Sequence, residues 1–155
     1  MSARIADKYK SRVILDTGST TTVVSKALLK QMPEVLKLCQ PTALTYSGVD
    51  AGSKSYDSII PNLQLQLTPD ITIEVIAGVV ETNDPYFIIG QDVLGGAKCR
   101  LRTIGYNTDY SILTVVDTVT GKIGNLHYLK NVEITGFPKT GYHTATAANA
   151  SINRV

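Results

Sequence analysis

The chain has 155 residues, of which 43% are hydrophobic and 18% are charged, with 15 basic against 13 acidic side chains. This balance excludes a disordered or fibrous protein and predicts one compact hydrophobic core. No cluster of Lys and Arg forms the stripe that a phosphate backbone needs, so we expect no nucleic-acid partner. Charges occur throughout residues 1–30, so we expect no signal peptide, no membrane span, and a soluble intracellular protein.

The N-terminal third predicts a hairpin, a further strand and a short helix. Ser25 is a suitable N-cap for a helix over residues 26–32, with Pro33 after its end, and residues 35–39 are compatible with one more helical turn. The apolar and β-branched stretches that predict strands are, in chain order, 3–6, 11–15 and 20–24.

The middle of the chain predicts mainly strands. Residues 42–46 and 53–60 flank the small, glycine-bearing segment 47–52, which indicates a hairpin that is able to bend. Alternating apolar and polar residues predict two half-buried strands, and shorter apolar runs predict two more. These four segments are 63–68, 71–80, 86–89 and 99–104.

The pattern changes from Gly105 onward. Residues 110–116 and 122–129 predict a second hairpin, whereas the sequence past Pro138 offers little to bury and predicts a loose tail or linker. We therefore divide the chain into a main domain, a hairpin extension and a tail, with the bounds 1–104, 105–138 and 139–155.

The most informative segment is Val13-Ile14-Leu15-Asp16-Thr17-Gly18-Ser19, an apolar strand that delivers one carboxylate into a tight turn. Backbone N–H groups can hydrogen-bond a carboxylate in such a turn, and Gly18 allows close backbone approach. One carboxylate is not enough to hydrolyse an amide. Two carboxylates at hydrogen-bond distance share one proton, so that one is the base for a water and the other the acid for the carbonyl.

Two separated blocks make the chain resemble the retropepsin-like aspartic proteases of retroviruses and LTR retrotransposons. The first block runs from Val13 to Ser25, and the second is Phe87-Ile88-Ile89-Gly90-Gln91-Asp92-Val93-Leu94. A glycine-tipped hairpin lies between them, and the resemblance covers about residues 3–103. It implies an all-β fold: a closed β-barrel of the acid-protease type with a flap hairpin and one or two short helices.

The resemblance also implies roles for individual residues. Asp16 is expected to be the catalytic acid, Thr17 to hold the paired turns together across a two-fold axis, and Gly18 to shape the surroundings of the carboxylate. Asp92 is expected to stabilise a helix cap or turn. The implied lining of the peptide-binding cleft is Ser19, Val23, Ile88 and the flap residues Ser47, Gly48, Val49, Asp50, Ala51 and Gly52.

By this resemblance the chain is expected to be a homodimeric aspartic endopeptidase, in which each subunit gives one Asp16. The single motif fits, because Asp117-Thr118-Val119 lacks the glycine of a second copy. The implied substrate is an extended segment of a retroelement or viral polyprotein, cut in the host cytoplasm or in a virus-like particle. No cofactor, metal, nucleic acid or membrane is implied.

The chain departs from the family pattern in several places. Thr20 and Gln91 stand where retroviral members often carry an acid and an arginine, and Gly95-Gly96 is expected to shorten the helix after Gly90. The chain also extends some fifty residues beyond Arg102. Our hypothesis is that the hairpin over 110–129 either takes part in dimerisation or packs on the outside of the barrel.

The same residues are compatible with other functions. Asp16 alone is also typical of a structural Asx-turn, and a retropepsin-like domain without catalysis would serve in dimerisation or peptide binding. A structural fragment of a polyprotein is a third interpretation. Cys39 and Cys99 lack ligands at metal-binding spacing, and the sequence has no Gly-x-Ser-x-Gly elbow for a serine triad with its histidines.

Overall fold

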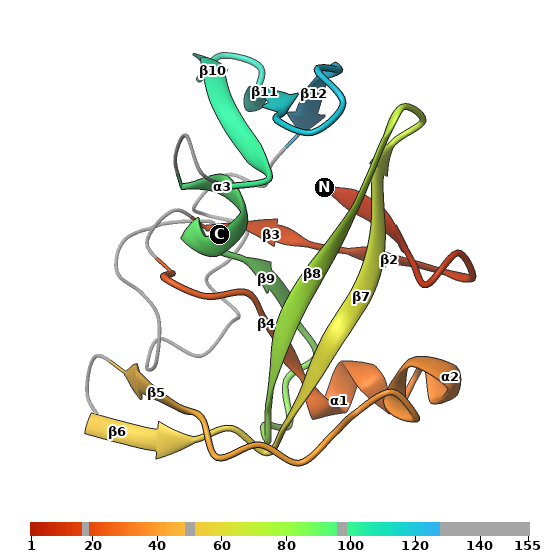
Figure 1. Ribbon diagram of the computed structural model, residues 1–155, viewed down its shortest axis with the longest axis vertical. Helices are drawn as coiled ribbons and strands as arrows, with labels where there is room; N and C mark the ends of the chain where they lie inside the picture. Colours follow the sequence, from red (N-terminus) through yellow and green to blue (C-terminus); the bar gives the residue numbers. More distant parts are fainter. Residues whose placement is uncertain (17–18, 49–51, 96–98, 128–155) are drawn as a thin grey trace.

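The computed structural model describes residues 1–16, 19–48, 52–95 and 99–127. This part of the chain is mostly β-structure, folded into a nearly closed, barrel-like sheet with a few short helices (Figure 1). The all-β class is thereby confirmed. The predicted tail over 139–155 and the predicted site residues Thr17, Gly18, Val49, Asp50 and Ala51 lie outside the described residues.

The described chain contains twelve strands and three helices, each kind numbered in chain order. The strands are β1 (Ser2–Ile5), β2 (Tyr9–Arg12), β3 (Ile14–Leu15), β4 (Val23–Ser25), β5 (Thr45–Gly48), β6 (Gly52–Ser55), β7 (Ser58–Thr68), β8 (Ile71–Val80), β9 (Phe87–Ile89), β10 (Leu101–Asn107), β11 (Ile112–Asp117) and β12 (Ile123–His127). The helices are α1 (Lys26–Leu29), α2 (Pro33–Leu36) and α3 (Gln91–Leu94).

The main sheet has seven strands in the order β2-β1-β7-β8-β4-β9-β3. The long β7–β8 hairpin forms its middle, and its strands contain the alternating segments 63–68 and 71–80 that the sequence predicted. Strand β9 lies between β4 and β3; it runs antiparallel to β4 and parallel to β3. The two sequence blocks that carry the family resemblance are therefore neighbours in one sheet.

The N-terminal hairpin differs from the sequence-based expectation at its second arm. Strand β2 pairs with β1 from Tyr9 onward, because Ala6 and Asp7 form a tighter turn with φ of 53° and 56°. Residues Ile14 and Leu15 do not continue this hairpin. They form a separate strand, β3, which pairs with β9 on the far side of the sheet.

The helical prediction was correct at its start and wrong at its end. The Ser25 side chain caps α1 by accepting a hydrogen bond from the Leu28 N–H at 3.2 Å. The predicted helix over 26–32 instead ends at Leu29, and Pro33 begins the separate helix α2. Proline suits this first helical position because it has no N–H to leave unpaired.

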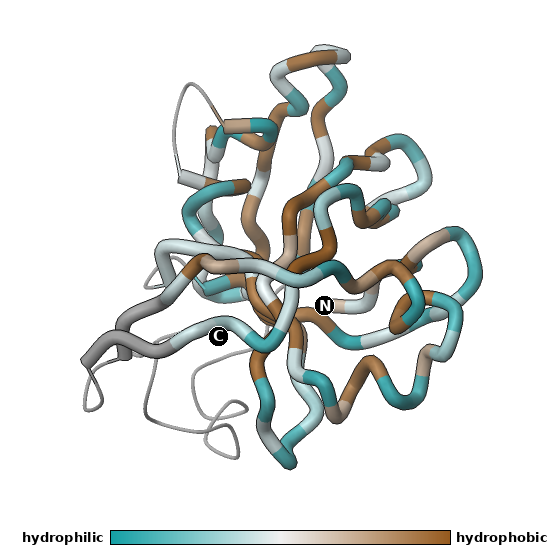
Figure 2. The backbone as a smooth tube through the Cα atoms, turned by 60° about the horizontal axis from the view of Figure 1, so that its bottom comes forward, coloured by the Kyte–Doolittle hydropathy of each residue, from teal (hydrophilic) through white to brown (hydrophobic). Residues whose placement is uncertain are grey.

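One apolar core holds these elements together. In Figure 2 the hydrophobic parts of the backbone converge on the middle of the molecule, whereas hydrophilic stretches occupy many of the outer turns. The core contains the inward residues of β1, β7 and β8, together with α1 and α2 side chains such as Leu29 and Val35.

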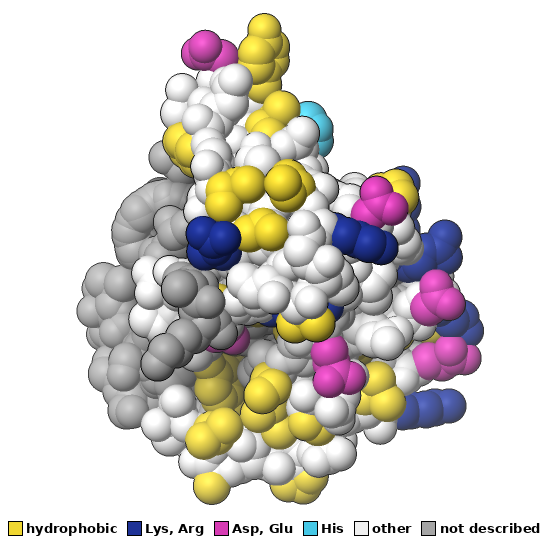
Figure 3. All heavy atoms as spheres, turned by 45° about the horizontal axis from the view of Figure 1, so that its top comes forward, with side chains coloured by type: hydrophobic (Ala, Val, Ile, Leu, Met, Phe, Trp, Pro, Cys, Tyr) yellow, Lys and Arg dark blue, Asp and Glu magenta, His cyan; other side chains and the backbone are white. Residues whose placement is uncertain are grey.

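Strands β10, β11 and β12 form a separate three-stranded sheet at one end of the molecule. Its inner residues Leu113, Val115 and Leu126 belong to the main core, so the sheet packs onto the barrel. Strand β10 crosses the boundary at residues 104 and 105 that the sequence suggested. Hydrophobic side chains gather at this end of the molecule in Figure 3, and large exposed ones on these strands include Ile104, Tyr106 and Ile123.

Within the described part of the chain, no helix has the length and apolar character required to cross a membrane.

Candidate functional site

Asp16 directly follows β3 and remains part of its ladder. Its backbone N–H donates to the Ile89 carbonyl of β9 at 3.0 Å. Side chains alternate between the two faces of a strand, so Asp16 shares the face of Ile14 and is opposite Leu15. Leu15 belongs to the main core. The carboxylate is therefore on the face of the sheet that is turned away from that core.

A row of apolar residues crosses this same face. The strand register places Ile14 beside Ile88, Ile88 beside Val23, and Val23 beside Gly78. The three side chains are buried but are not members of the main core. Val23 and Ile88, two predicted cleft residues, thus share the face that carries Asp16.

The loop that follows Asp16 is fastened to the start of α3 by both backbone and side chains. Asp92 accepts hydrogen bonds from the Thr22 N–H and from Thr22 Oγ1, at 3.1 and 2.8 Å. This contact supports the structural role that the resemblance implied for Asp92. A backbone bond adds to it, because the Gln91 N–H donates to the Ser19 carbonyl oxygen at 2.8 Å. Within the loop, the Ser19 N–H donates to the Asp16 carbonyl oxygen at 3.2 Å.

Gly90 allows the loop and β9 to approach this closely. A Cβ atom at residue 90 would lie 2.4 Å from the Thr21 carbonyl oxygen and 2.7 Å from that of Ser19. The Gly90 N–H also donates to Thr22 Oγ1 at 3.2 Å. The glycine of the second block is therefore a packing requirement of the loop of the first block.

Ser19 was predicted to bind substrate, but its hydroxyl has a partner within the chain. Ser19 Oγ donates to the Thr21 carbonyl oxygen at 2.7 Å, and the residue is buried. The segments that contain Thr20 and Gln91 are joined by a backbone bond, in which the Gln91 N–H donates to the Ser19 carbonyl oxygen.

The hairpin predicted around residues 47–52 is present as β5–β6, here called the flap hairpin. Its register pairs Ser47 with Ser53 and Gly48 with Gly52. These two strands form a sheet of their own, which projects away from the barrel in Figure 1. The flap residues Ser47, Gly48 and Gly52 thus lie in the hairpin that the sequence predicted.

Tyr56 is a site residue that the sequence analysis missed. It follows β6, and its hydroxyl lies 2.9 Å from Thr21 Oγ1 in the loop after Asp16. Its ring occupies the space over Gly78, where a Cβ atom would lie 2.3 Å from Tyr56 Cε1. The available signal was Gly78, which lies in the apolar run 76–80 of the predicted strand, because a glycine inside a strand often marks a close approach of another group.

Burial is the property of Asp16 that most limits its chemistry. The residue is only 1% exposed, so a substrate can reach its carboxylate only if the groups that cover it move. Among the described residues, no group of three His, Cys, Asp or Glu side chains is arranged to hold a metal ion. The chemistry that the described site offers is therefore that of a buried carboxylate beside an apolar row.

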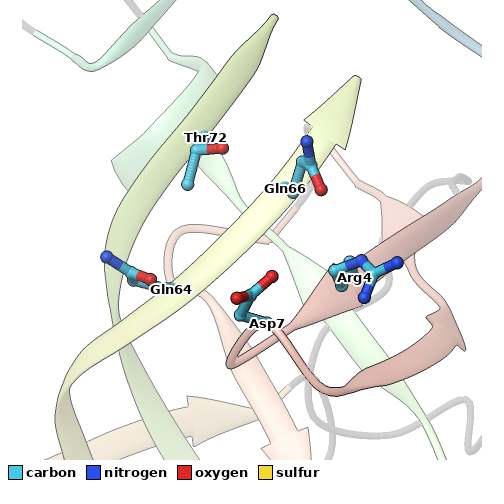
Figure 4. Close-up of a pocket in the computed structure, with 5 residues that line it drawn as sticks. All are labelled: Arg4, Asp7, Gln64, Gln66 and Thr72. Carbon is cyan, nitrogen blue, oxygen red and sulfur yellow. The ribbon is translucent and has the colours of Figure 1, made fainter. Parts of the chain in front are cut away.

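A separate hollow of about 240 Å³ lies on other elements of the sheet. Its residues come from β1, the turn after it, β7 and β8, and they are polar or charged (Figure 4). It contains none of the predicted site residues. The lining residues are Arg4, Asp7, Gln64, Gln66 and Thr72.

Neither a protein-family model nor a curated protein matches this sequence.

Proposed function

We propose that the chain is one subunit of a homodimeric aspartic endopeptidase of the retropepsin-like type. The observation that carries the proposal is the placement of Asp16 at the end of β3, braced by β9 and α3 and on the same face as Ile14, Ile88 and Val23. Once it is uncovered, this face supplies an acid, and the buried row beside it supplies apolar contacts for an extended peptide.

The proposed reaction needs two copies of Asp16. Two carboxylates at hydrogen-bond distance share one proton, because like charges so close together cannot both ionise. The ionised carboxylate takes a proton from the attacking water, and the protonated one donates to the carbonyl oxygen of the scissile bond. Because both forms are required together, we expect a bell-shaped pH profile with an acidic optimum.

The second copy supplies the second acid in this proposal. The hypothesis that the 110–129 hairpin takes part in dimerisation stays a prediction. It is supported by the exposed apolar side chains on the sheet that this hairpin forms with β10, among them Ile123 at 63% exposure. The proposed substrate is an extended, largely apolar segment of a retroelement or viral polyprotein.

A second candidate function follows from the burial of Asp16. An acid that is 1% exposed also suits a domain of the same fold that binds a peptide or a second copy without cutting it. The two functions differ in one requirement: the protease must uncover Asp16 when substrate or the second subunit binds, whereas the binding module need not.

Turnover of an extended peptide library separates the two candidates. The protease is expected to cleave a subset of apolar peptides, and a statine-type transition-state mimic is expected to inhibit it. Asp16→Asn is expected to lower kcat by about a thousandfold or more, because it removes the groups that transfer the proton. Sedimentation should give a dimer for both proteins.

Asp70→Asn is the matched control, since Asp70 is exposed in the turn between β7 and β8. This variant should keep wild-type turnover. Cleavage that survives Asp16→Asn would eliminate the mechanism. A strictly monomeric protein that cleaves no peptide but still binds one would favour the binding module.

A further inference from the structure

The side chain of Tyr56 joins the base of the flap hairpin to the loop after Asp16. The backbone at the base of the hairpin is held to its neighbours, with Tyr56 N–H donating to Leu44 O at 3.1 Å and Asp57 N–H to Val79 O at 2.8 Å. From this fixed base the Tyr56 hydroxyl reaches Thr21 Oγ1 at 2.9 Å. The tyrosine is 8% exposed and Thr21 is exposed, so the contact lies at the edge of the buried region.

Gly78 sets the position of the Tyr56 ring. It lies at the end of the row formed by Ile14, Ile88 and Val23, and it has no side chain of its own. The ring fills the space that a side chain at residue 78 would need. The N–H of the same glycine donates to the Thr22 carbonyl oxygen at 3.0 Å. One residue of β8 thus contacts both the tyrosine and the loop.

A short chain of hydrogen bonds leads from Tyr56 to Asp16. Thr21 is bonded to Tyr56 through its hydroxyl, and its carbonyl accepts from Ser19 Oγ at 2.7 Å. The Ser19 N–H donates to the Asp16 carbonyl oxygen at 3.2 Å. The hairpin base is therefore linked through hydrogen bonds to the backbone that carries the acid.

We propose that Tyr56 is a positioning residue that couples the flap hairpin to the loop bearing Asp16. Its ring fixes the hairpin base over β8, and its hydroxyl fixes Thr21. The catalytic consequence rests on the proposed function: a peptide that lies between the hairpin and Asp16 is aligned with the acid only while both move together. Misalignment of reacting groups lowers the rate of the chemical step more than it weakens binding.

Tyr56→Phe tests the coupling because it keeps the ring over Gly78 and removes only the hydroxyl. Hydrogen exchange of the backbone amides is expected to become about tenfold faster in β5, β6 and at Ser19, the change that loss of one hydrogen bond of ordinary strength gives. Amides of β11 should be unchanged. Tyr9→Phe, on the distant strand β2, is the matched control and should leave all of these rates at wild-type values.

Kinetics and a double-mutant cycle provide the second readout. Tyr56→Phe is expected to lower kcat about tenfold with KM nearly unchanged, and Tyr56→Phe combined with Thr21→Val should be no worse than the more severe single variant. Wild-type exchange rates in Tyr56→Phe, or additive effects in the cycle, would overturn the coupling.

The exchange experiment is repeated on Asp16→Asn protein, where no cleavage takes place. If Tyr56→Phe makes exchange faster in that protein, the coupling is established without any measurement of cleavage. If the wild-type protein also cleaves no peptide, the proposed function fails while the coupling stands. Unchanged exchange beside full peptidase activity would instead reject the coupling and leave the proposed function in place.

Discussion

Gly90 lies where the loop after Asp16 crosses the end of β9. Gly90→Ala is expected to destabilise the fold by about 1–3 kcal/mol, the range for overpacking a tight contact, because the new Cβ would meet backbone carbonyl oxygens that cannot turn aside. Urea unfolding measures this loss. Gly105→Ala is the matched control, since its nearest neighbour, Thr114 Cβ, lies at 3.4 Å. Equal stability of the two variants would contradict the packing role of Gly90.

Asp117 is the second buried acid of the described chain, and its role is structural. Its carboxylate accepts from Arg100 Nε at 2.8 Å and from Arg100 Nη2 at 3.1 Å. The N–H of Val119 also donates to it, at 2.9 Å. The hydrogen bond from Arg100 holds the pKa of Asp117 well below its ordinary value, against the opposing effect of burial.

This lowered pKa makes part of the stability depend on pH. A group whose pKa is depressed by folding contributes fully above its unfolded pKa, near 3.8, and loses the contribution as pH falls below that value. Asp117→Asn is expected to cost about 3 kcal/mol at pH 7, the low end for a broken buried pair because Arg100 is partly exposed.

The measurement is the free energy of unfolding of wild type and Asp117→Asn between pH 7 and pH 2. The difference between them should shrink once the pH falls below 3.8. Asp109→Asn, at an exposed turn of the same sheet, should match wild type at every pH. A constant difference across the whole range would show that the carboxylate's charge is not what stabilises the sheet.

At the scale of elements, Ser25 joins α1 to the start of β9. Its buried Oγ accepts from the Leu28 N–H at 3.2 Å and from the Tyr86 N–H at 2.9 Å. Ser25→Ala is expected to cost about 2 kcal/mol, because it leaves two buried donors without this acceptor. Thermal unfolding of this variant should be compared with Ser11→Ala, whose hydroxyl bonds an exposed neighbouring carbonyl. A Ser25→Ala protein as stable as that control would rule out the dual cap.

At the scale of the whole molecule, the C-terminal sheet is part of the fold. A chain that ends at Gly105 loses Leu113, Val115 and Leu126 from the main core. Each such side chain contributes about 1.5–3 kcal/mol, and their sum is comparable to the total stability of a typical domain. We therefore expect this shortened chain to lose cooperative unfolding, as measured by circular dichroism.

A chain that ends at His127 is the control for this truncation. It retains every described strand and should unfold cooperatively, like the full chain. If the chain ending at Gly105 instead melted as one unit near the full-length temperature, the three-stranded sheet would be an independent appendage. Loss of dimerisation in the shortened chain would support a role of the 110–129 hairpin in the dimer only if that chain still unfolded cooperatively.

Local patterns were sufficient to predict much of the fold. Alternation over residues 63–80 predicted the β7–β8 hairpin, and Ser25 predicted the start of α1. They were not sufficient where a tertiary partner decides the outcome. Ile14 and Leu15 look like the end of a hairpin arm, but their partner is β9, more than seventy residues away. Helix α1 also ends earlier than the pattern over residues 26–32 predicted, at Leu29, and α2 begins at Pro33.

The sequence by itself determined the all-β class and the glycine-bearing hairpin, because each depends on neighbouring residues alone. Only the tertiary structure decided that Ile14, Ile88 and Val23 form one row beside the acid, that Tyr56 reaches Thr21, and that Asp16 is buried. Strand register and burial depend on segments far apart in the chain, so local pattern cannot fix them.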